Sequence, residues 1–217
     1  MKKRALYASI ALLPILGFAP LTTKSPEAKT IEKLQKLETP PKAGDSMPMF
    51  LIDDASGDGF HDLSKLLEHG PVVINFFRGS WCPYCIGELT AVQKHLGDIT
   101  SAGATVLAIS PEKPSKTADL MKQKSLGFLF GTDDENALAK KLALSFELDA
   151  KTVERYTKYG INLNEANDSQ KWELPIPATY IIDTDGTVAW AFVDEDYSKR
   201  PDYALVVKKL RDMQQED

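Results

Sequence analysis

The chain has 217 residues, of which 43% are hydrophobic and 26% are charged, proportions that are ordinary for a soluble globular protein. They exclude a wholly disordered chain and a polytopic membrane protein. The net charge of −5 argues against a nucleic-acid-binding protein, which usually has a basic surface. With only 2 cysteines, a framework of several disulfides is excluded too.

The N-terminal segment has the layout of a secretory signal. Basic residues at 2–4 precede an uncharged, mostly apolar run at 5–21, which Pro14 and Pro20 interrupt. A spanning helix needs about 20 apolar residues, so we expect residues 1–21 to be a cleaved signal peptide or, alternatively, an N-terminal anchor. The protein is then expected to be exported to the periplasm or the extracellular space. It would contact a membrane only if this segment is not cleaved.

Residues 22–43 are polar and rich in Lys, Glu and Pro, as is typical of a solvated linker. Within them, Ile31, Leu34 and Leu37 are spaced as on one face of a helix. Residues 44–217 are enough for one domain with a substantial core and too few for two comfortable domains.

Strand-like and helix-like segments alternate through this domain. The predicted strands are 49–53, 71–77, 104–109, 128–130, 178–183 and 187–193. The predicted helices are 63–67, 85–99, 115–126, 136–144, 149–159 and 203–213, with a polar loop over 162–171. This alternation predicts an α/β fold, in which a central, mainly parallel sheet has helices on both faces. The Asp185-Gly186 turn adds an antiparallel edge pair, so the sheet is mixed.

Both cysteines lie in Trp81-Cys82-Pro83-Tyr84-Cys85, between the most apolar predicted strand and the next helix. Open α/β sheets usually carry their sites at such a strand end. Cysteines at positions i and i+3 fall on one side of a helical turn and can approach closely enough to form a disulfide. Pro83 suits the first helical turn, and the positive end of a helix lowers the pKa of a thiol. The spacing therefore predicts a pair that cycles between dithiol and disulfide.

Two other roles for the cysteine pair are less well supported. A zinc site needs four ligands, and the histidines His61, His69 and His95 form no partner motif. A structural disulfide across so short a loop stabilises a protein little. We therefore expect neither a metal nor a cofactor at this site.

A second feature is Ile176-Pro177, directly before the fifth predicted strand. A proline there can be trans and of local importance only. In combination with the cysteine motif, it favours a cis Ile–Pro bond that faces the sulfur atoms and offers a backbone edge to an incoming peptide. We accordingly expect Ile176 and Pro177, with Trp81, Pro83 and Tyr84, to contact the substrate.

Together these blocks resemble the thioredoxin superfamily. The stretches FFRGSWCPYCIGEL and LPIPATYIIDTDGTVAWAFVDEDY are similar to the peroxiredoxin-like branch of the alkyl hydroperoxide reductase/thiol-specific antioxidant family, over roughly residues 44–210. The resemblance implies a thioredoxin-like fold, a thiol-based enzyme and an antioxidant role in redox homeostasis. It also implies an electron donor of the thioredoxin type. Cys-Pro-Tyr-Cys is typical of glutaredoxins as well, which are shorter proteins.

The resemblance leaves the chemistry open. Cys85 matches the peroxide-reacting cysteine of peroxiredoxins. However, Arg78, Cys82 and Pro177 stand where that pattern has Pro, Thr and a catalytic Arg. Cys82 and Pro177 instead match thioredoxin-type oxidoreductases, so the main hypothesis is thiol–disulfide exchange. In it, Cys82 is the exposed nucleophile and Cys85 resolves the mixed disulfide.

The alternative is a thiol peroxidase that reduces hydrogen peroxide or organic hydroperoxides. In that reaction Cys85 becomes the sulfenic acid and Cys82 condenses with it. A third hypothesis is a non-catalytic binding module that keeps the same fold.

Arg78 and Glu88 are expected to support the pair. Arg78 either supplies a positive charge to the site or lies in solvent at the end of a strand. Glu88 either assists proton transfer to a buried Cys85 or is an exposed helix residue. Asn75 occupies the strand position at which thioredoxins have a buried acid, so no proton route through that position is expected.

Overall fold

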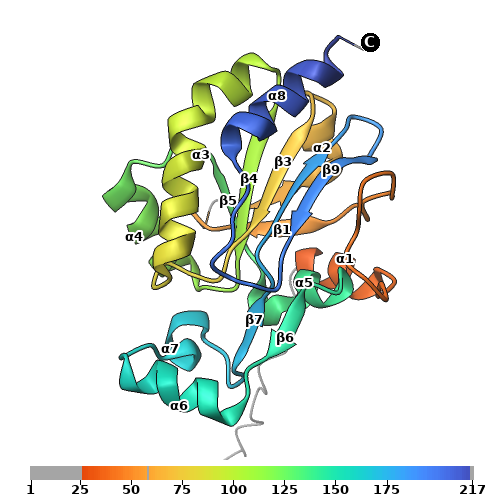
Figure 1. Cartoon of the computed structure of the whole chain (residues 1–217). Coiled ribbons are helices and arrows are strands. Elements are labelled where there is room, and N and C mark those ends of the chain that lie inside the picture. Colours follow the sequence, from red (N-terminus) through yellow and green to blue (C-terminus); the bar gives the residue numbers. More distant parts are fainter. Residues whose placement is uncertain (1–25, 58, 216–217) are drawn as a thin grey trace, which may run out of the picture.

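The computed structural model describes residues 26–57 and 59–215, and a seven-stranded sheet forms its centre (Figure 1). The strands of this sheet are β1 (Leu51–Asp54), β2 (Phe60–Asp62), β3 (Val72–Phe76), β4 (Thr105–Ser110), β5 (Leu129–Thr132), β8 (Ala178–Ile182) and β9 (Val188–Val193). They lie in the order β2-β1-β5-β4-β3-β8-β9. β4 is parallel to β3 and β5, and the other neighbouring pairs are antiparallel. The sheet is therefore mixed, with the predicted antiparallel pair at one edge. The expectation that it is mainly parallel is wrong, because four of its six neighbouring pairs are antiparallel.

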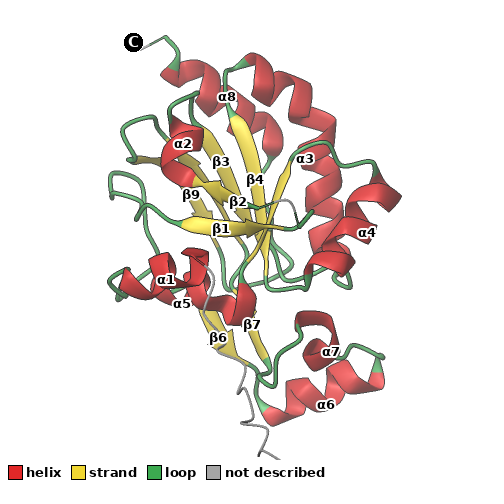
Figure 2. Cartoon of the chain, turned by 180° about the vertical axis from the view of Figure 1, so that it is seen from behind, coloured by secondary structure: helices red, strands yellow, loops and turns green. Residues whose placement is uncertain are grey.

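Helices cover both faces of this sheet (Figures 1 and 2). They are α1 (Pro26–Lys33), α2 (Leu63–Leu67), α3 (Pro83–Ser101), α4 (Pro114–Lys124), α5 (Ala137–Lys141) and α8 (Tyr203–Met213). α3, α4 and α8 share one core with Val73 of β3, whereas α1, α2 and α5 share the other with Val72 and Ile74. This division follows from the alternation of side chains along a strand. The predicted α/β architecture, with helices on both faces, is confirmed.

Residues 145–175 form a small insertion beside the main sheet, at the lower end of both views (Figures 1 and 2). Its elements are β6 (Ser145–Glu147), α6 (Ala150–Lys158), α7 (Leu163–Asn167) and β7 (Glu173–Pro175). β6 and β7 pair antiparallel. Tyr156, Leu163 and Leu174 form a separate small core, and Trp81 of the cysteine motif packs against it. The insertion is thereby attached next to the cysteine motif.

The predicted loop over 162–171 is wrong at α7. The Asn162 side chain accepts a hydrogen bond from the Glu165 amide at 3.3 Å and caps this helix, while Leu163 is fully buried. The strands β2, β6 and β7 were not predicted, because three residues are too few to show a period of two.

Part of the predicted linker at 22–43 is packed against the domain. α1 lies in this stretch, and Ile31 is only 5% exposed. Leu34 and Leu37 pack against the same core, so the apolar stripe joins this segment to the domain. The described part of the stretch is therefore not a solvated linker.

The predicted signal peptide or anchor at residues 1–21 lies outside the described residues. Over the part of the chain that the structure describes, no helix has the length and apolar character needed to cross a membrane.

Candidate active site

The two cysteines lie at the start of α3, which follows β3 after a short loop. Cys82 is the N-terminal cap of this 19-residue helix, with extended backbone angles (φ −93°, ψ 114°). Pro83 occupies the first turn, where a backbone N–H would have no partner within the helix, so the N–H that proline lacks is not needed there. The Cys82 carbonyl accepts the first helical bond from Ile86 at 3.0 Å. The local sequence thus places the pair at the positive end of a long helix.

Both cysteines are free thiols and both are fully buried, with 0% exposure. A hydrogen bond from the Cys85 thiol and the charge of Arg78 lower the pKa of Cys82 to about 5, although burial opposes this shift. The same bond between the sulfur atoms, together with burial, raises the pKa of Cys85 well above its ordinary value. The structure brings the two sulfur atoms together, as their spacing predicts, and makes them chemically unequal.

Arg78 is buried beside the sulfur atoms, with 3% exposure. Its Nη2 donates to Cys82 Sγ at 3.1 Å, and its backbone N–H donates to Cys85 Sγ at 3.4 Å. Among the described residues, no carboxylate forms an ion pair with Arg78. Of the two alternatives for Arg78, the structure shows the positive charge at the site. The anion available to balance this charge is a thiolate on Cys82.

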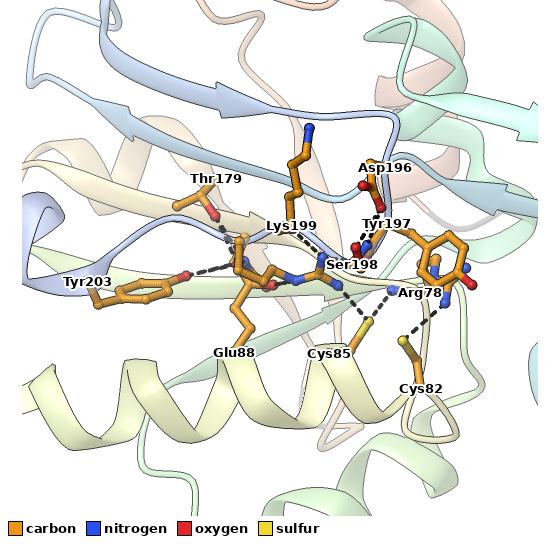
Figure 3. A network of polar contacts seen from close by, with 12 residues as sticks. Arg78, Cys82, Cys85, Glu88, Thr179, Asp196, Tyr197, Ser198, Lys199 and Tyr203 are labelled. Carbon is orange, nitrogen blue, oxygen red and sulfur yellow. Dashed lines mark hydrogen bonds and ion pairs between the residues drawn. The ribbon is translucent and has the colours of Figure 1, made fainter.

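Aromatic side chains hold the Arg78 guanidinium in place. Its Nη1 donates to the Tyr156 hydroxyl at 2.9 Å. Its central carbon lies 4.1 Å from the centre of the Tyr197 ring and 5.2 Å from that of Trp81. Figure 3 shows Tyr197 beside Arg78, next to the sulfur atom of Cys82. These rings exclude water around the cation and so strengthen its attraction to a thiolate.

A second guanidinium, that of Arg200, reaches the site from the loop between β9 and α8. Arg200 Nη2 donates to Cys85 Sγ at 3.4 Å, and Nε forms an ion pair with the Glu88 carboxylate. The sequence analysis missed this residue, because it lies 115 positions from Cys85 and belongs to no motif. The only feature of the sequence that could have indicated Arg200 is that it is a basic residue in the loop before the last helix.

Glu88 is buried, with 4% exposure, so the alternative of an exposed helix residue is wrong. It accepts hydrogen bonds from Asn75 Nδ2 at 2.8 Å, Thr179 Oγ1 at 3.2 Å and the Tyr203 hydroxyl at 3.3 Å (Figure 3). Burial raises the pKa of Glu88, and Arg200 opposes this shift. The buried acid of this site therefore comes from α3, whereas the strand position holds the amide that donates to it.

The Ile176–Pro177 bond is trans, since no peptide bond among the described residues is cis. The prediction of a cis bond is therefore wrong. Ile176 N donates to the Leu144 carbonyl, and Ala178 pairs with Phe76, so the chain passes extended from β7 into β8, as a trans bond allows. Ile176 packs in the core on the face of the sheet opposite the cysteines. This residue does not contact the sulfur pair.

A cavity of about 340 Å³ opens beside the motif. Its walls include Trp81, Pro83 and Tyr84, the three motif residues predicted to contact the substrate, whereas Ile176 and Pro177 are not among them. The opposite wall comes from α6 of the insertion, which the sequence analysis did not single out. Within residues 26–57 and 59–215, no three His, Cys, Asp or Glu side chains are grouped as metal ligands.

Comparisons with known proteins support a common family. The AhpC/TSA family model matches residues 43–191. Peroxiredoxin Bcp of Escherichia coli (strain K12) is 24% identical over 166 residues, which cover 76% of this chain and 94% of that protein. Peroxidoxin BcpB of Mycobacterium tuberculosis has a similar crystal structure (TM-score 0.64, 20% identity, 80% of this chain and 98% of that chain). The solved structure of peroxiredoxin Q of Xanthomonas campestris is also similar, with a TM-score of 0.56 and 19% identity over 76% of this chain and 90% of that chain. The predicted thioredoxin-like fold is confirmed.

Proposed function

The chain belongs to the AhpC/TSA family, as its sequence predicted, and we propose that it is a thiol peroxidase of the peroxiredoxin type. It reduces a hydroperoxide with Cys82 and Cys85 as the redox pair. The family match supports this activity, as do relatives that are themselves named peroxiredoxins. The proposal thus takes the peroxidase activity from the alternative of the sequence analysis, in preference to the main hypothesis of disulfide exchange, but it reverses the roles that the alternative gave to Cys82 and Cys85.

The observation that carries the proposal is the complete burial of both sulfur atoms. In thiol–disulfide exchange, the attacking thiolate must reach a sulfur atom of the partner, which requires access for a large molecule. Cys82, the expected exposed nucleophile of that reaction, is 0% exposed. A hydroperoxide presents a reacting group of only two oxygen atoms and needs far less room. Burial therefore favours a small peroxide over a protein disulfide as the oxidising substrate.

Cys82 is the sulfur that attacks in this proposal, although Cys85 matches the peroxide-reacting position of the family. The two guanidinium groups differ in whether a carboxylate already neutralises their positive charge. The Glu88 carboxylate neutralises Arg200, which lies by Cys85. Arg78, which lies by Cys82, has no such partner among the residues described. The thiolate is therefore stabilised on Cys82, and the proton stays on Cys85.

The reaction then proceeds in two steps. The Cys82 thiolate attacks the terminal oxygen of the hydroperoxide, so that an S–O bond forms and the O–O bond breaks. The sulfur is oxidised to a sulfenic acid, and the departing alkoxide takes up the proton that Cys82 had released on ionisation. The Cys85 thiol next attacks the Cys82 sulfur, an S–S bond forms, and the hydroxyl leaves with the Cys85 proton as water.

A dithiol must return the pair to its reduced state. Two thiols of an electron donor of the thioredoxin type would transfer two electrons to the Cys82–Cys85 disulfide and become a disulfide themselves. Because both sulfur atoms are buried in this structure, this step requires the oxidised pair to become accessible to the donor. Export of the protein, which rests on residues 1–21, remains a prediction. In an oxidising compartment, this donor would need its own supply of electrons.

Single-turnover measurements test the proposal. The reduced Cys85→Ser protein should consume one equivalent of hydrogen peroxide and form a sulfenic acid that dimedone traps at Cys82. The reduced Cys82→Ser protein should consume peroxide no faster than a free thiol does. The opposite pattern would move the attack to Cys85 and keep the peroxidase. If neither variant nor the native protein consumed peroxide, the peroxidase proposal would be wrong, and disulfide exchange or a binding module would remain.

A further inference from the structure

We infer that the cavity beside the motif binds the body of its hydroperoxide substrate, and that this body combines an aromatic or other flat apolar group with a carboxylate. The inference rests on the proposed peroxidase function and specifies its substrate class. Four features of the cavity carry it: its apolar walls, its position, its charge and its size.

The walls of the cavity are aromatic and uncovered. Tyr84, Tyr159 and Tyr197 line it and are 48%, 76% and 38% exposed. Among the described residues only seven large apolar side chains are exposed, and three of them surround this one opening. Phe146, also 38% exposed, lines the adjoining hollow. Scattered apolar side chains on a surface are ordinary, but a cluster beside a reactive group indicates a binding site.

The cavity reaches Arg78, the residue that contacts the attacking sulfur atom, although the buried Cys82 does not itself line it. Arg78 lines it, and Nη2 of this residue lies 3.1 Å from Cys82 Sγ. Pro83, the residue after Cys82, forms part of the same wall. Trp81 stacks edge to face on Tyr156, with 5.5 Å between the ring centres, and this pair joins the motif to the insertion. A body bound here therefore places its hydroperoxide group at the Arg78–Cys82 end.

The charge of the cavity favours an anion. Two arginines line it, Arg78 and Arg155, and no Asp or Glu is among its lining residues. The Cys82 thiolate balances Arg78, so Arg155 on α6 remains for a ligand. Glu147, Asp149 and Glu195 line the adjoining hollow with Arg155, but none of the three forms an ion pair with it among the described residues. Asp149, whose pKa Arg155 lowers, caps α6 and accepts a hydrogen bond from the Thr152 amide at 2.8 Å. Arginine binds carboxylates through two parallel hydrogen bonds, which makes a carboxylate the fitting group.

The volume is more than hydrogen peroxide requires. At about 340 Å³ the cavity is within the range of sites for small organic molecules, roughly 300–1,000 Å³. A flat ring between Tyr84 and Tyr159 would carry its carboxylate toward Arg155 and its hydroperoxide toward Cys82. The insertion, which contributes α6, therefore determines which hydroperoxides the site prefers.

Binding without chemistry provides the first test. 4-Isopropylbenzoate has the proposed body and charge but no hydroperoxide, and 4-isopropylbenzamide is its neutral counterpart. Calorimetry on the full chain should show that the benzoate binds and that the benzamide binds about tenfold more weakly. Arg155→Gln should remove this difference, and Tyr159→Ala should weaken both ligands. Equal binding of the two ligands to the native protein, or no binding of either, would overturn the inference.

Turnover provides the second test. The ratio of kcat/KM for 4-carboxycumyl hydroperoxide to that for hydrogen peroxide should fall about tenfold in Arg155→Gln. Lys122→Gln on α4 removes a positive charge outside the cavity, and Phe60→Ala removes an exposed aromatic ring from β2, so neither should change the ratio. An unchanged ratio in Arg155→Gln, with peroxide still reduced, would overturn the inference alone. If the native protein reduced no peroxide at all, the proposed function would be wrong. Benzoate binding could still be measured, so the two failures can be told apart.

Discussion

Arg78 Nη2 lies 3.1 Å from Cys82 Sγ, inside a ring of aromatic side chains and without a carboxylate partner among the described residues. This pairing gives one of two adjacent cysteines a thiolate and leaves the proton on the other. A cation that is buried and not otherwise neutralised acts strongly on its neighbour, because little water screens it. The reactivity of the site should therefore depend on this contact as well as on the hydrogen bond from the Cys85 thiol, which is the larger cause of the low Cys82 pKa.

Replacing Arg78 tests this dependence. In a Cys85→Ser background, the rate of Cys82 alkylation by iodoacetamide should still follow a pKa below that of a free thiol, because Arg78 remains, although the contribution of the Cys85 thiol is lost. Adding Arg78→Gln should raise this pKa by about one unit or more, because the charge that stabilises the thiolate is gone. Alkylation at pH 6 should then slow accordingly. Lys122→Gln serves as the control for net charge, and an unchanged alkylation profile in Arg78→Gln would contradict the role of Arg78.

The Glu88–Arg200 pair should contribute to stability as a unit. Arg200→Met leaves the Glu88 carboxylate buried without its ion-pair partner, so the free energy of unfolding in urea should fall by about 3–5 kcal/mol. Adding Glu88→Gln should recover part of this loss, because the amide needs no counter-ion. If the loss of unfolding free energy in the double variant equalled the sum of the losses in the two single variants, the two residues would not interact.

Asp133 should make the protein less stable as the pH rises. It is 1% exposed, and its carboxylate accepts hydrogen bonds from the amides of Leu138 at 2.7 Å and Ala139 at 2.9 Å. Burial raises its pKa to about 7, so the folded chain holds this proton more tightly than the unfolded chain does. The resulting stability is fully present below about pH 4 and is lost as the pH rises to about 7. Urea unfolding at several pH values should show this slope.

Asp133→Asn is the comparison variant, since an amide does not titrate. Its single acceptor oxygen can keep only one of the two backbone hydrogen bonds, so the variant should be less stable, and the comparison uses the dependence of stability on pH. Its unfolding free energy should change less between pH 4 and pH 7 than that of the native protein. Glu88 and Glu112, whose pKa values burial also raises, titrate in both proteins, so the comparison isolates Asp133. Parallel slopes would contradict the assignment.

Tyr197 should limit access to the sulfur pair. Its ring covers Arg78 at 4.1 Å (Figure 3). It also meets Tyr84 edge to face, with 5.7 Å between the ring centres. Tyr197→Ala removes a cation–π contact worth about 1–2 kcal/mol, so a bulky aromatic disulfide reagent should react about tenfold faster with Cys82. Phe60→Ala, on the distant strand β2, should react at the native rate. Equal rates in Tyr197→Ala and the native protein would show that another element limits access.

Several parts of this structure could be predicted because they depend on local sequence. The apolar run at 71–77 is buried on both faces as β3, and the boundaries of α2 and α8 agree with the predicted helices at 63–67 and 203–213. The junction between β3 and α3 follows from Pro83, which starts a helix but cannot continue a strand ladder. These features involve neighbours in the chain, and hydrophobic periodicity reports on them directly.

Other parts depend on contacts between distant segments. Tyr156 lies 78 positions from Arg78, yet its hydroxyl orients the guanidinium that acts on Cys82. The helix that carries Tyr156 was predicted at 149–159, but nothing in the sequence places this helix beside the cysteine motif. The expected cis bond before Pro177 was wrong, because a proline before a strand, combined with the cysteine motif, does not determine the isomer, and the chain between β7 and β8 runs extended.

The sequence by itself determined that two cysteines meet at the positive end of a helix, since spacing along one turn and a proline at its start are local properties. It also determined the family, because the blocks that carry the resemblance are continuous in the chain. Only the tertiary structure decided which sulfur carries the negative charge and whether a partner can reach it. Charge balance and burial both depend on groups that folding brings from far along the chain, as Arg200 reaches Cys85 across 115 residues.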